Sequence, residues 1–177
     1  MQNKYWEKFY TENKVLKQSS FAEFIFILNF LKHKVLELGC GNGRDLIFFR
    51  RKKINARGID NAYQNNYFIK KTDVAEYIKL NSCNEDVYTR FFWHAIERPL
   101  QLKILKWVKH KIFIEARTTE DKPTLYKKHK RNFVNVPQLV KDLKNNNFEI
   151  LYLKEGYGMS KYKNEDPHLV RIIATKK

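Results

Sequence analysis

The fold of this chain is decided by one stretch of its sequence, Lys34-Val35-Leu36-Glu37-Leu38-Gly39-Cys40-Gly41-Asn42-Gly43-Arg44-Asp45. Residues 34–38 have the apolar character of a short buried strand, and residues 46–49 continue as an apolar run with helical spacing. Between them, Gly39, Gly41 and Gly43 let the backbone turn sharply and approach a ligand closely, because no Cβ intervenes. Such a turn at a helix N-terminus is where α/β sheets bind nucleotide-like ligands. The stretch therefore predicts an α/β fold with a ligand site at the turn.

The spacing of the glycines distinguishes two classes of ligand. A dinucleotide site uses G-x-G-x-x-G around a pyrophosphate, whereas this chain has G-x-G-x-G, preceded by Glu37. A carboxylate there would repel a pyrophosphate and would suit a cationic amino-acid ligand. Asp60 ends the next predicted strand, residues 55–59, and follows the first glycine at the spacing of about 20 residues that suits a carboxylate binding the ribose hydroxyls.

Together, the strand, acid, glycines, helix and second acid resemble the first two motifs of the class I S-adenosylmethionine-dependent methyltransferases. The resemblance implies S-adenosyl-L-methionine as the cofactor. It also implies a Rossmann-like sheet of seven strands in the order 3-2-1-4-5-7-6, with strand 7 antiparallel and helices on both faces. The implied cofactor-binding residues are Ser20, Phe21, Glu37, Gly39, Cys40, Gly41, Asn42, Gly43, Asp60, Asn61, Asp73, Val74 and Arg90. Of these, Cys40 is interpreted mainly as a small packing residue of the turn.

The rest of the chain alternates helical and strand patterns within one predicted domain, residues 1–177. Residues 1–18 are polar with scattered aromatic side chains and predict an amphipathic arm over that domain. Ser20 and Glu23 predict a capping box for a helix over residues 21–31. Further helices are predicted from the glycine turn to residue 53 and over residues 74–80, 99–109 and 136–145. The predicted strands are residues 34–38, 55–59, 67–70, 85–90, 111–117, 148–153 and 168–174.

The candidate functional residues of the chain lie mostly in the loops at the carboxyl ends of the predicted parallel strands. Ligands of open α/β sheets bind outside that edge. Here it carries the glycine turn, most of the conspicuous charges and the two longest loops. This convergence favours an enzyme over a pure binding module.

Two further sets of residues in these loops are candidates for chemistry on the methyl acceptor. The candidates for a general base on a hydroxyl acceptor, with histidine preferred because it titrates nearest neutral pH, are His129, His94 and Glu115. The predicted substrate-binding residues are Trp93, Arg117, Arg131 and Tyr157. The two arginines of that set would bind an anionic group in bidentate fashion.

The segment after the fourth predicted strand faces the transferred methyl group in folds of this kind. It reads Arg90-Phe-Phe-Trp-His-Ala-Ile96 and lacks the Asn/Asp-Pro-Pro-Tyr/Phe signature, which weighs against methylation of exocyclic amines by that mechanism. Arg90, at the end of the strand, is expected to meet a carboxylate, either that of the cofactor or that of Glu37 or Glu115.

A looser resemblance extends over residues 18–175. It rests on Ser-Ser-Phe-Ala before the first predicted helix, on Glu-Ala-Arg-Thr-Thr-Glu-Asp at residues 115–121, and on Glu-Asp-Pro-His-Leu-Val-Arg at residues 165–171. These segments look like a bacterial and phage-associated branch that is often found with surface-polysaccharide biosynthesis. The branch implies a small, anionic, sugar-related or phosphorylated acceptor.

The net charge of +16 allows two interpretations. One is a polyanion partner such as RNA, and the other is a lysine-rich composition spread over solvated faces, which we favour. A broad positive face beyond the predicted site would support an RNA methyltransferase, and binding without turnover would support a non-catalytic S-adenosylmethionine-binding protein. Glu37 and the glycine spacing disfavour a nicotinamide-dependent dehydrogenase.

The remaining features of the sequence concern the cellular location of the protein and its cysteines. The N-terminus lacks the apolar segment of a secretory signal, and no apolar run approaches the ~18 residues of a membrane span. The two cysteines, Cys40 and Cys83, have neither a disulfide nor a metal-ligand spacing. We therefore expect a cytoplasmic protein without a metal centre.

Overall fold

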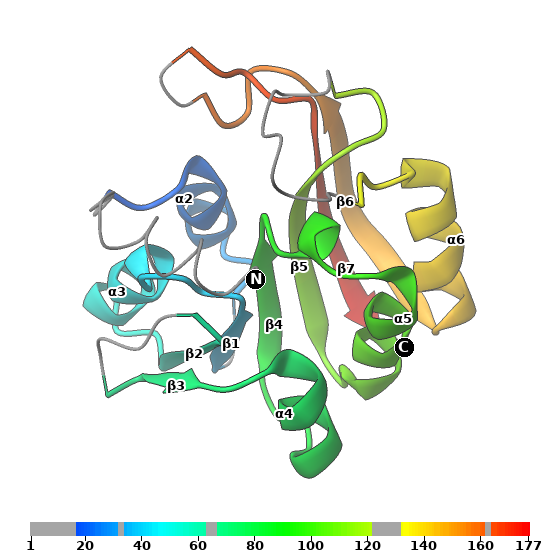
Figure 1. Ribbon diagram of the computed structural model, residues 1–177. Coiled ribbons are helices and arrows are strands. Elements are labelled where there is room, and N and C mark those ends of the chain that lie inside the picture. Colours follow the sequence, from blue (N-terminus) through cyan, green and yellow to red (C-terminus); the bar gives the residue numbers. More distant parts are fainter. Residues whose placement is uncertain (1–16, 32–33, 63–66, 122–131, 162–163) are drawn as a thin grey trace.

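The computed structural model describes residues 17–31, 34–62, 67–121, 132–161 and 164–177 (Figure 1). Their seven strands form one sheet in the order β3-β2-β1-β4-β5-β7-β6. The strands are β1 (Val35–Leu38), β2 (Ala56–Asp60), β3 (Ile69–Lys71), β4 (Asp86–Arg90), β5 (Lys111–Arg117), β6 (Phe148–Gly156) and β7 (Leu169–Lys176). The first five are parallel, and β7 is antiparallel to both of its neighbours, β5 and β6. The predicted order and the antiparallel strand 7 are confirmed.

Helices cover both faces of this sheet. They are α2 (Ser20–Ile27), α3 (Arg44–Arg51), α4 (Val74–Leu80), α5 (Arg98–Trp107) and α6 (Val136–Asn145), with a 3₁₀ turn, η1 (Trp93–Ala95). The helices α2 and α3 pack with Val35, Tyr88 and Phe113 into one hydrophobic core. On the other face α4, α5 and α6 pack into a second, larger core with Leu36 and Leu38.

Side chains of β1 alternate between these two cores. Leu36 and Leu38 belong to the core beneath α4–α6, and Val35 belongs to the core beneath α2 and α3. Because successive side chains of a strand point to opposite faces, Glu37 shares the α2–α3 face with Val35. The alternation of the strand therefore directs an acid into the layer between the sheet and α2–α3.

The prediction of α2 is wrong at both of its ends. The N-cap is Ser19, not Ser20: the Ser19 hydroxyl accepts a hydrogen bond from the Ala22 amide at 3.0 Å. The helix ends at Ile27 because Asn29 adopts a left-handed backbone conformation with φ 54°. The predicted capping box at Ser20 and Glu23 is therefore replaced by a cap one residue earlier.

The segment that follows β4 forms the single turn η1. Phe91 has a φ of 56°, a conformation that is strained for a residue with a large side chain. The chain thus bends sharply at the end of β4 before it reaches η1. Such strain is typical of positions near functional sites.

Two further expectations from the sequence concern membrane spans and the N-terminal arm. Among the described residues, no helix combines the length and the apolar character needed to cross a bilayer. Of the predicted arm, residues 1–18, only the last two residues belong to the described part of the chain.

Candidate functional site

The turn between β1 and α3 requires its glycines. Gly39, Gly41 and Gly43 all have left-handed backbone conformations, with φ of 69°, 54° and 72°. A Cβ on Gly43 would lie 2.7 Å from the Ile69 side chain, and one on Gly39 would collide with the Phe92 ring. The backbone of the turn is therefore open to close approach only while these positions carry no side chain.

Asp60, the acid predicted at the end of the second strand, is held against this turn. Its Oδ2 accepts from the Gly41 amide at 2.9 Å, and its Oδ1 accepts from the Ala62 amide at 2.8 Å. The side chain is 8% exposed. The next residue, Asn61, is exposed. The two backbone amides hold the carboxylate in one orientation at the carboxyl end of the sheet.

Glu37 is a buried acid without a full set of partners. It is 4% exposed, and within the described part of the chain its Oε2 has no hydrogen-bond partner. Burial, and then the negative charge of Asp45, raises the pKa of Glu37 well above its ordinary value, while Arg44 and Arg90 lower it. A buried polar atom left unsatisfied is costly, so this carboxylate marks a place for a donor that the described residues do not supply.

Two residues at the start of α3, Arg44 and Asp45, belong to the site although sequence reasoning gave them no role. Asp45 is 1% exposed and accepts from the Ser19 amide and hydroxyl, both at 2.7 Å, and from the Tyr88 hydroxyl at 2.9 Å. Burial, and then the charge of Arg90, lowers the pKa of Arg44. An acid in the first turn of a helix is the feature of the sequence that could have indicated Asp45. Its partners, Ser19 and Tyr88, come from distant segments and could not be read from the local sequence.

A row of alternating charges crosses β4, β5 and β7 beneath the start of α2. Arg90, Glu115 and Arg171 are paired in register. Glu115 is fully buried, accepts from the Arg171 Nε at 2.6 Å and lies 2.9 Å from the Arg90 Nε in an ion pair. The expectation that Arg90 meets a protein acid is confirmed, and the acid is Glu115.

This geometry can be compared with known proteins. No protein-family model and no curated protein matches the sequence. Solved structures do match. The chain has the class I methyltransferase fold.

Three solved methyltransferases illustrate the likeness. A SAM dependent methyltransferase from Archaeoglobus fulgidus is 18% identical, with a TM-score of 0.65 over 88% of this chain and 92% of that one. The 1,6-didemethyltoxoflavin-N1-methyltransferase from Burkholderia thailandensis, with S-adenosylhomocysteine bound, is 13% identical, with a TM-score of 0.68 over 89% and 76%. Magnesium protoporphyrin IX methyltransferase from Synechocystis, also with bound SAH, is 14% identical, with a TM-score of 0.65 over 89% and 80%. At these identities the likeness establishes the fold.

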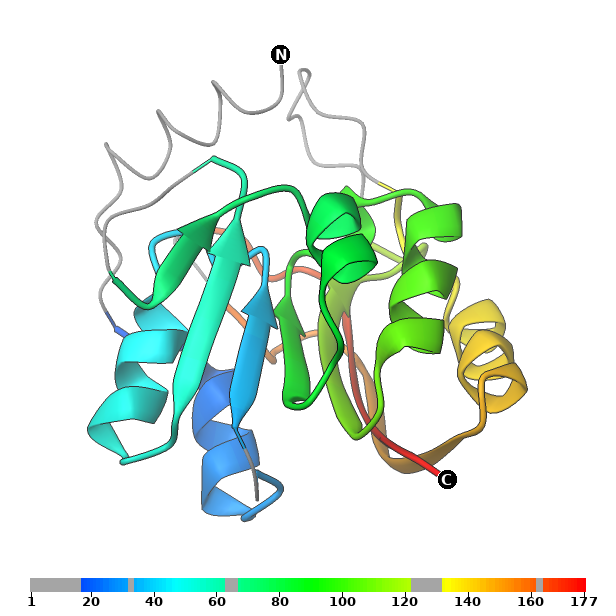
Figure 2. The same cartoon turned by 90° about the horizontal axis from the view of Figure 1, so that it is seen from below.

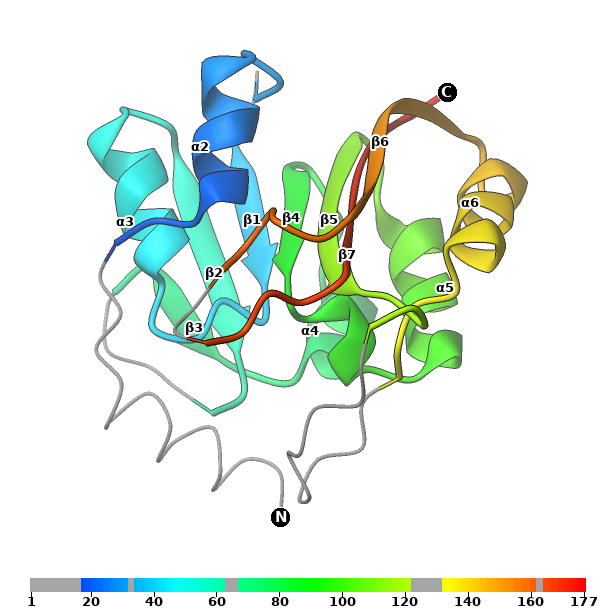
Figure 3. The same ribbon diagram turned by 90° about the horizontal axis from the view of Figure 1, so that it is seen from above.

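In this example of the class I methyltransferase fold, hydrogen bonds hold the connection between β6 and β7 across the site. We call residues 156–161 the strap. The Met159 carbonyl accepts from the Ser20 hydroxyl at 2.7 Å and from the Arg171 guanidinium at 2.8 Å. The Ser160 hydroxyl accepts from the Arg90 guanidinium at 2.9 Å. Figure 3 shows this orange-to-red connection extending from β6 and β7 toward α2 and α3.

His94 lies in η1, the turn that follows β4, and its contacts do not favour the predicted role of general base. It is 5% exposed, and its Nδ1 accepts from the Arg117 backbone amide at 3.1 Å. A neutral imidazole that accepts at Nδ1 carries its proton on Nε2. His94 is therefore arranged to donate a hydrogen bond. Glu115, held between two arginines, is likewise unsuited to remove a proton.

Arg117 is not arranged as the predicted anion clamp. Its guanidinium lies 3.0 Å from Asp121 and 2.6 Å from Glu165, so two carboxylates of the chain already bind it. The predicted partner Arg131 and the first-ranked base His129 lie outside the described residues. The anionic acceptor that these arginines suggested is thus not supported by the contacts of Arg117.

Tyr157, one of the predicted substrate-binding residues, is exposed to solvent at the carboxyl-end rim. It is 50% exposed, and the edge of its ring packs on His168, with centroids 4.8 Å apart. The Nδ1 of His168 lies 2.6 Å from the Thr118 hydroxyl. Sequence reasoning missed His168, which directly precedes β7.

The other predicted residues divide into buried and exposed positions. Trp93 and Phe21 are fully buried, and Val74 and Cys40 are nearly so. The placement of Trp93 in the core does not favour direct contact with a substrate. Asp73 is exposed and caps α4 by accepting from two backbone amides, those of Ala75 at 2.7 Å and Glu76 at 3.2 Å. Asp73 is therefore the N-cap of α4.

Proposed function

We propose that this protein is an S-adenosylmethionine-dependent methyltransferase that acts on a small acceptor molecule. The observation that carries the proposal is the unsatisfied carboxylate of Glu37, buried behind the glycine turn and close enough to Arg44 and Arg90 for their charges to lower its pKa. An acid and two guanidiniums in one buried place are complementary to the ammonium and carboxylate of an amino acid. The methionine end of the cofactor carries those two groups.

The other cofactor contacts follow from the same arrangement. Asp60, held by the amides of Gly41 and Ala62, would accept hydrogen bonds from the ribose hydroxyls. Asp73 would accept from the adenine amino group, with Val74 beside the ring. The glycine turn would let the backbone approach the cofactor closely. These roles rest on the fold and on the positions of the side chains.

The chemistry asked of the protein is mainly positioning. When bound, S-adenosylmethionine supplies a methyl group on a sulfonium centre. The chain's own residues would align the acceptor in line with that bond and exclude water, which supplies much of the acceleration of such displacements. For a hydroxyl acceptor a general base is also needed, and His129 stays the first prediction for it.

The identity of the acceptor stays a separate proposal. The sequence resemblance suggests an anionic, sugar-related or phosphorylated molecule. With Arg117 bound by Asp121 and Glu165, the anionic character depends on Arg131. A panel of phosphorylated and unphosphorylated sugars, assayed by release of S-adenosylhomocysteine, would test it. Binding of the cofactor with no turnover on any acceptor would favour the non-catalytic alternative.

The test of the cofactor is calorimetric titration with S-adenosylmethionine and S-adenosylhomocysteine. We expect micromolar binding, weakened about tenfold or more in Asp60→Ala by loss of a charge-assisted contact. Asp60→Asn is the matched variant, because it keeps an acceptor for one of the two amides. Absence of binding by a protein with a cooperative thermal transition would contradict the proposal.

A further inference from the structure

Cations gather at the edge of the sheet opposite the candidate site. The parallel strands begin at this edge, and α3, α5, α6 and β7 end there, as Figure 2 shows with β1 and β2 pointing away from it and the C-terminus lying beside it. We call it the amino edge. Its described cations are Lys34, Arg50, Arg51, Lys52, Lys53, Lys109, Lys111, Lys144, Lys176 and Lys177.

The described acids of the amino edge compensate this charge only in part. Glu85 binds Arg57 at 2.6 Å, and Asp86 is fully buried. Glu149 lies 4.0 Å from Lys177. Burial, and then the charge of Lys109, lowers the pKa of Lys176, so like charges at this edge already repel one another.

Acids gather instead at the carboxyl-end rim. They are Glu37, Asp45, Asp60, Asp73, Glu115, Glu120, Asp121, Glu155, Glu165 and Asp166. The rim also carries cations, among them Arg44, Lys71, Arg90, Arg98, Arg117, Lys161 and Arg171, so acids and bases are mixed there. The excess of positive charge in the described residues therefore lies at the amino edge, and a lysine-rich composition spread evenly over the surface does not explain that position.

One end of the amino edge presents an aromatic side chain. Tyr67, just before β3, is 89% exposed. The Arg50 guanidinium lies 5.3 Å from the centre of its ring and donates to its hydroxyl at 2.9 Å. An exposed aromatic ring beside arginine is a surface on which an unpaired base can stack.

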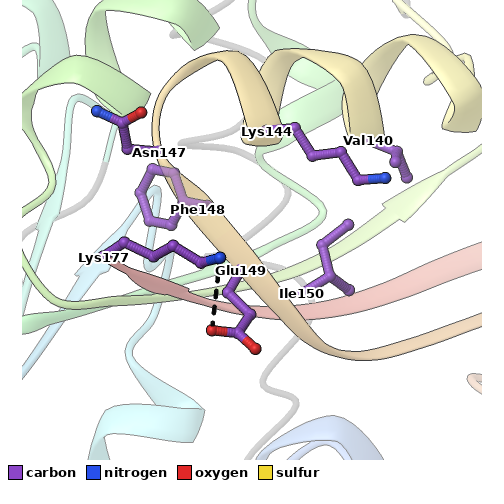
Figure 4. A pocket seen from close by; sticks show the side chains of 7 residues that line it. All are labelled: Val140, Lys144, Asn147, Phe148, Glu149, Ile150 and Lys177. Carbon is purple, nitrogen blue, oxygen red and sulfur yellow. Dashed lines mark ion pairs between the residues drawn. The ribbon is translucent and has the colours of Figure 1, made fainter.

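The other end of the amino edge is hollowed. An open cavity of about 610 Å³ lies between the last turns of α6 and the start of β6 (Figure 4). Its lining includes Lys144, Asn147, Phe148 and Lys177. It thus combines two cations with an amide, although Glu149 also lines it and pairs with Lys177, and Phe148 is nearly buried.

We propose that the amino edge binds single-stranded nucleic acid. The row of cations runs across the width of the sheet, about 30 Å at the usual strand spacing, and can follow several successive phosphates. The aromatic end at Tyr67 would stack a base. A membrane surface fits less well, because membrane-binding faces carry a band of apolar side chains. Ile27 and Leu28 are strongly exposed at this edge, but they lie together at the end of α2.

This surface is distinct from the proposed cofactor site. β5 alone, from Lys111 at the amino edge to Arg117 at the rim, separates them by about 20 Å. The proposal therefore stands or falls independently of methyl transfer.

The experiment is fluorescence anisotropy of labelled single-stranded RNA and DNA of about 20 nucleotides, titrated with the full chain between about 50 and about 300 mM KCl. Charge reversal by Lys109→Glu, Lys144→Glu and Lys177→Glu together is expected to weaken binding more than tenfold. The slope of log affinity against log salt should become shallower by about 2, since each phosphate contact contributes about 0.7. Tyr67→Ala is expected to weaken binding about fivefold with the slope unchanged.

The matched control reverses three exposed lysines outside the amino edge, Lys17→Glu, Lys154→Glu and Lys161→Glu, and should change affinity much less. Equal weakening by both triple variants would show attraction by net charge alone and would overturn the proposal. So would absence of binding at the lowest salt, or binding to vesicles with about 30% phosphatidylserine but not to nucleic acid. Thermal melting and S-adenosylhomocysteine titration of each variant report its folding, and the single variant Lys144→Glu replaces a triple variant that fails to fold.

Discussion

Glu37 places a carboxylate where water does not solvate it. Its strand alternates between two cores, so the side chain enters the layer beneath α2 and α3. Its Oε2 has no hydrogen-bond partner among the described residues. A residue of this kind destabilises the protein that carries it and is explained by a ligand that pairs with it.

Glu37→Gln is expected to have opposite effects on stability and on cofactor binding. The pKa of Glu37 is raised on folding above its ordinary value of 4.5. The glutamate therefore favours the folded state fully below pH 4.5 and loses that contribution as pH rises through the raised pKa. The glutamine variant should thus gain stability relative to the native protein as pH rises, by about 1–3 kcal/mol at neutral pH. Denaturant unfolding across pH measures this gain.

In the same variant, affinity for S-adenosylmethionine should fall about tenfold or more, because a charge-assisted hydrogen bond is lost. Glu76→Gln, on the exposed face of α4, is the matched control and should change neither quantity. A glutamine variant that binds as tightly as the native protein would remove Glu37 from the site.

Cofactor binding is also expected to release a proton from Glu37. The ammonium of the ligand would lower the raised pKa of this carboxyl group, so the group ionises as the complex forms. Calorimetry in two buffers with different ionisation enthalpies measures the release. Glu37→Gln should abolish it, and a release that persists in the variant would assign the proton to another group.

Individual residues of the site were predictable where the local sequence defines their position. Asp60 and the three glycines lie in one motif whose backbone requirements are local. The environment of Arg117 was not predictable, because Glu165 reaches it from the segment before β7. Ser19, Tyr88 and Asp45 likewise meet only through tertiary packing.

At the scale of elements, the strap couples three parts of the fold. Ser20 is the first residue of α2, Arg90 ends β4 and Arg171 lies in β7. All three form hydrogen bonds with Met159 or Ser160 of the strap. The neutral hydrogen bond from Ser20 contributes about 1 kcal/mol, and each of the two from guanidiniums contributes about 1.5–3 kcal/mol. The position of the strap is therefore stabilised by several separate contacts.

Ser20→Ala is expected to loosen the strap. It removes a donor to the Met159 carbonyl and an acceptor for Arg171. Trypsin should cleave after the exposed Lys161 about five times faster, in line with the loss of about 1 kcal/mol, and S-adenosylhomocysteine should dissociate faster in stopped-flow experiments. Ser82→Ala, at an exposed serine away from the site, serves as the control. Unchanged cleavage and dissociation rates would show that the contacts of Ser20 do not hold the strap.

Gly58→Ala is expected to disturb the packing of α3 on β2. An added Cβ would lie 2.5 Å from the Leu46 side chain and 2.6 Å from the Cys40 sulfur. Overpacking of this kind costs about 1–3 kcal/mol, measurable as a lower midpoint of denaturant unfolding. Gly58→Ala combined with Cys40→Ala should recover part of the loss, and failure to do so would show that Cys40 does not pack against this position.

Element boundaries were predicted best where the cap is encoded locally. The bounds of α4 and α6 match the predictions, since Asp73 and Asn135 cap them through their own side chains. The start of α2 was misplaced because Ser19 and Ser20 are both suitable caps. Asp45, from α3, binds Ser19 and selects it.

At the scale of the whole molecule, the excess of positive charge lies at the amino edge, whereas acids and bases are mixed at the rim. The net charge is +16, so self-repulsion opposes the compact state. Raising NaCl from about 20 to about 200 mM shortens the reach of these charges and is expected to raise the melting temperature by about 2–4 °C, equivalent to about 1 kcal/mol. A lower melting temperature at high salt would show that attractive pairs, not repulsion, dominate.

The antiparallel final pair was predictable because the last two predicted strands lack a helix between them. The order of the strands was predicted from the resemblance of the glycine motif to the class I methyltransferases. The cavity beside α6 and the excess of positive charge at the amino edge were not predictable, because they arise from which ends of helices and strands meet at one edge.

The position of β7 also bears on how the protein is made. β5 and β6 precede it in the chain, yet β7 lies between them and pairs with both. While a ribosome is still adding the residues of β7, β5 and β6 have no partner on their facing sides. The sheet can therefore close only after Leu169–Lys176 has been synthesised, and until then two strand edges depend on other means, such as chaperones, to avoid pairing with other chains.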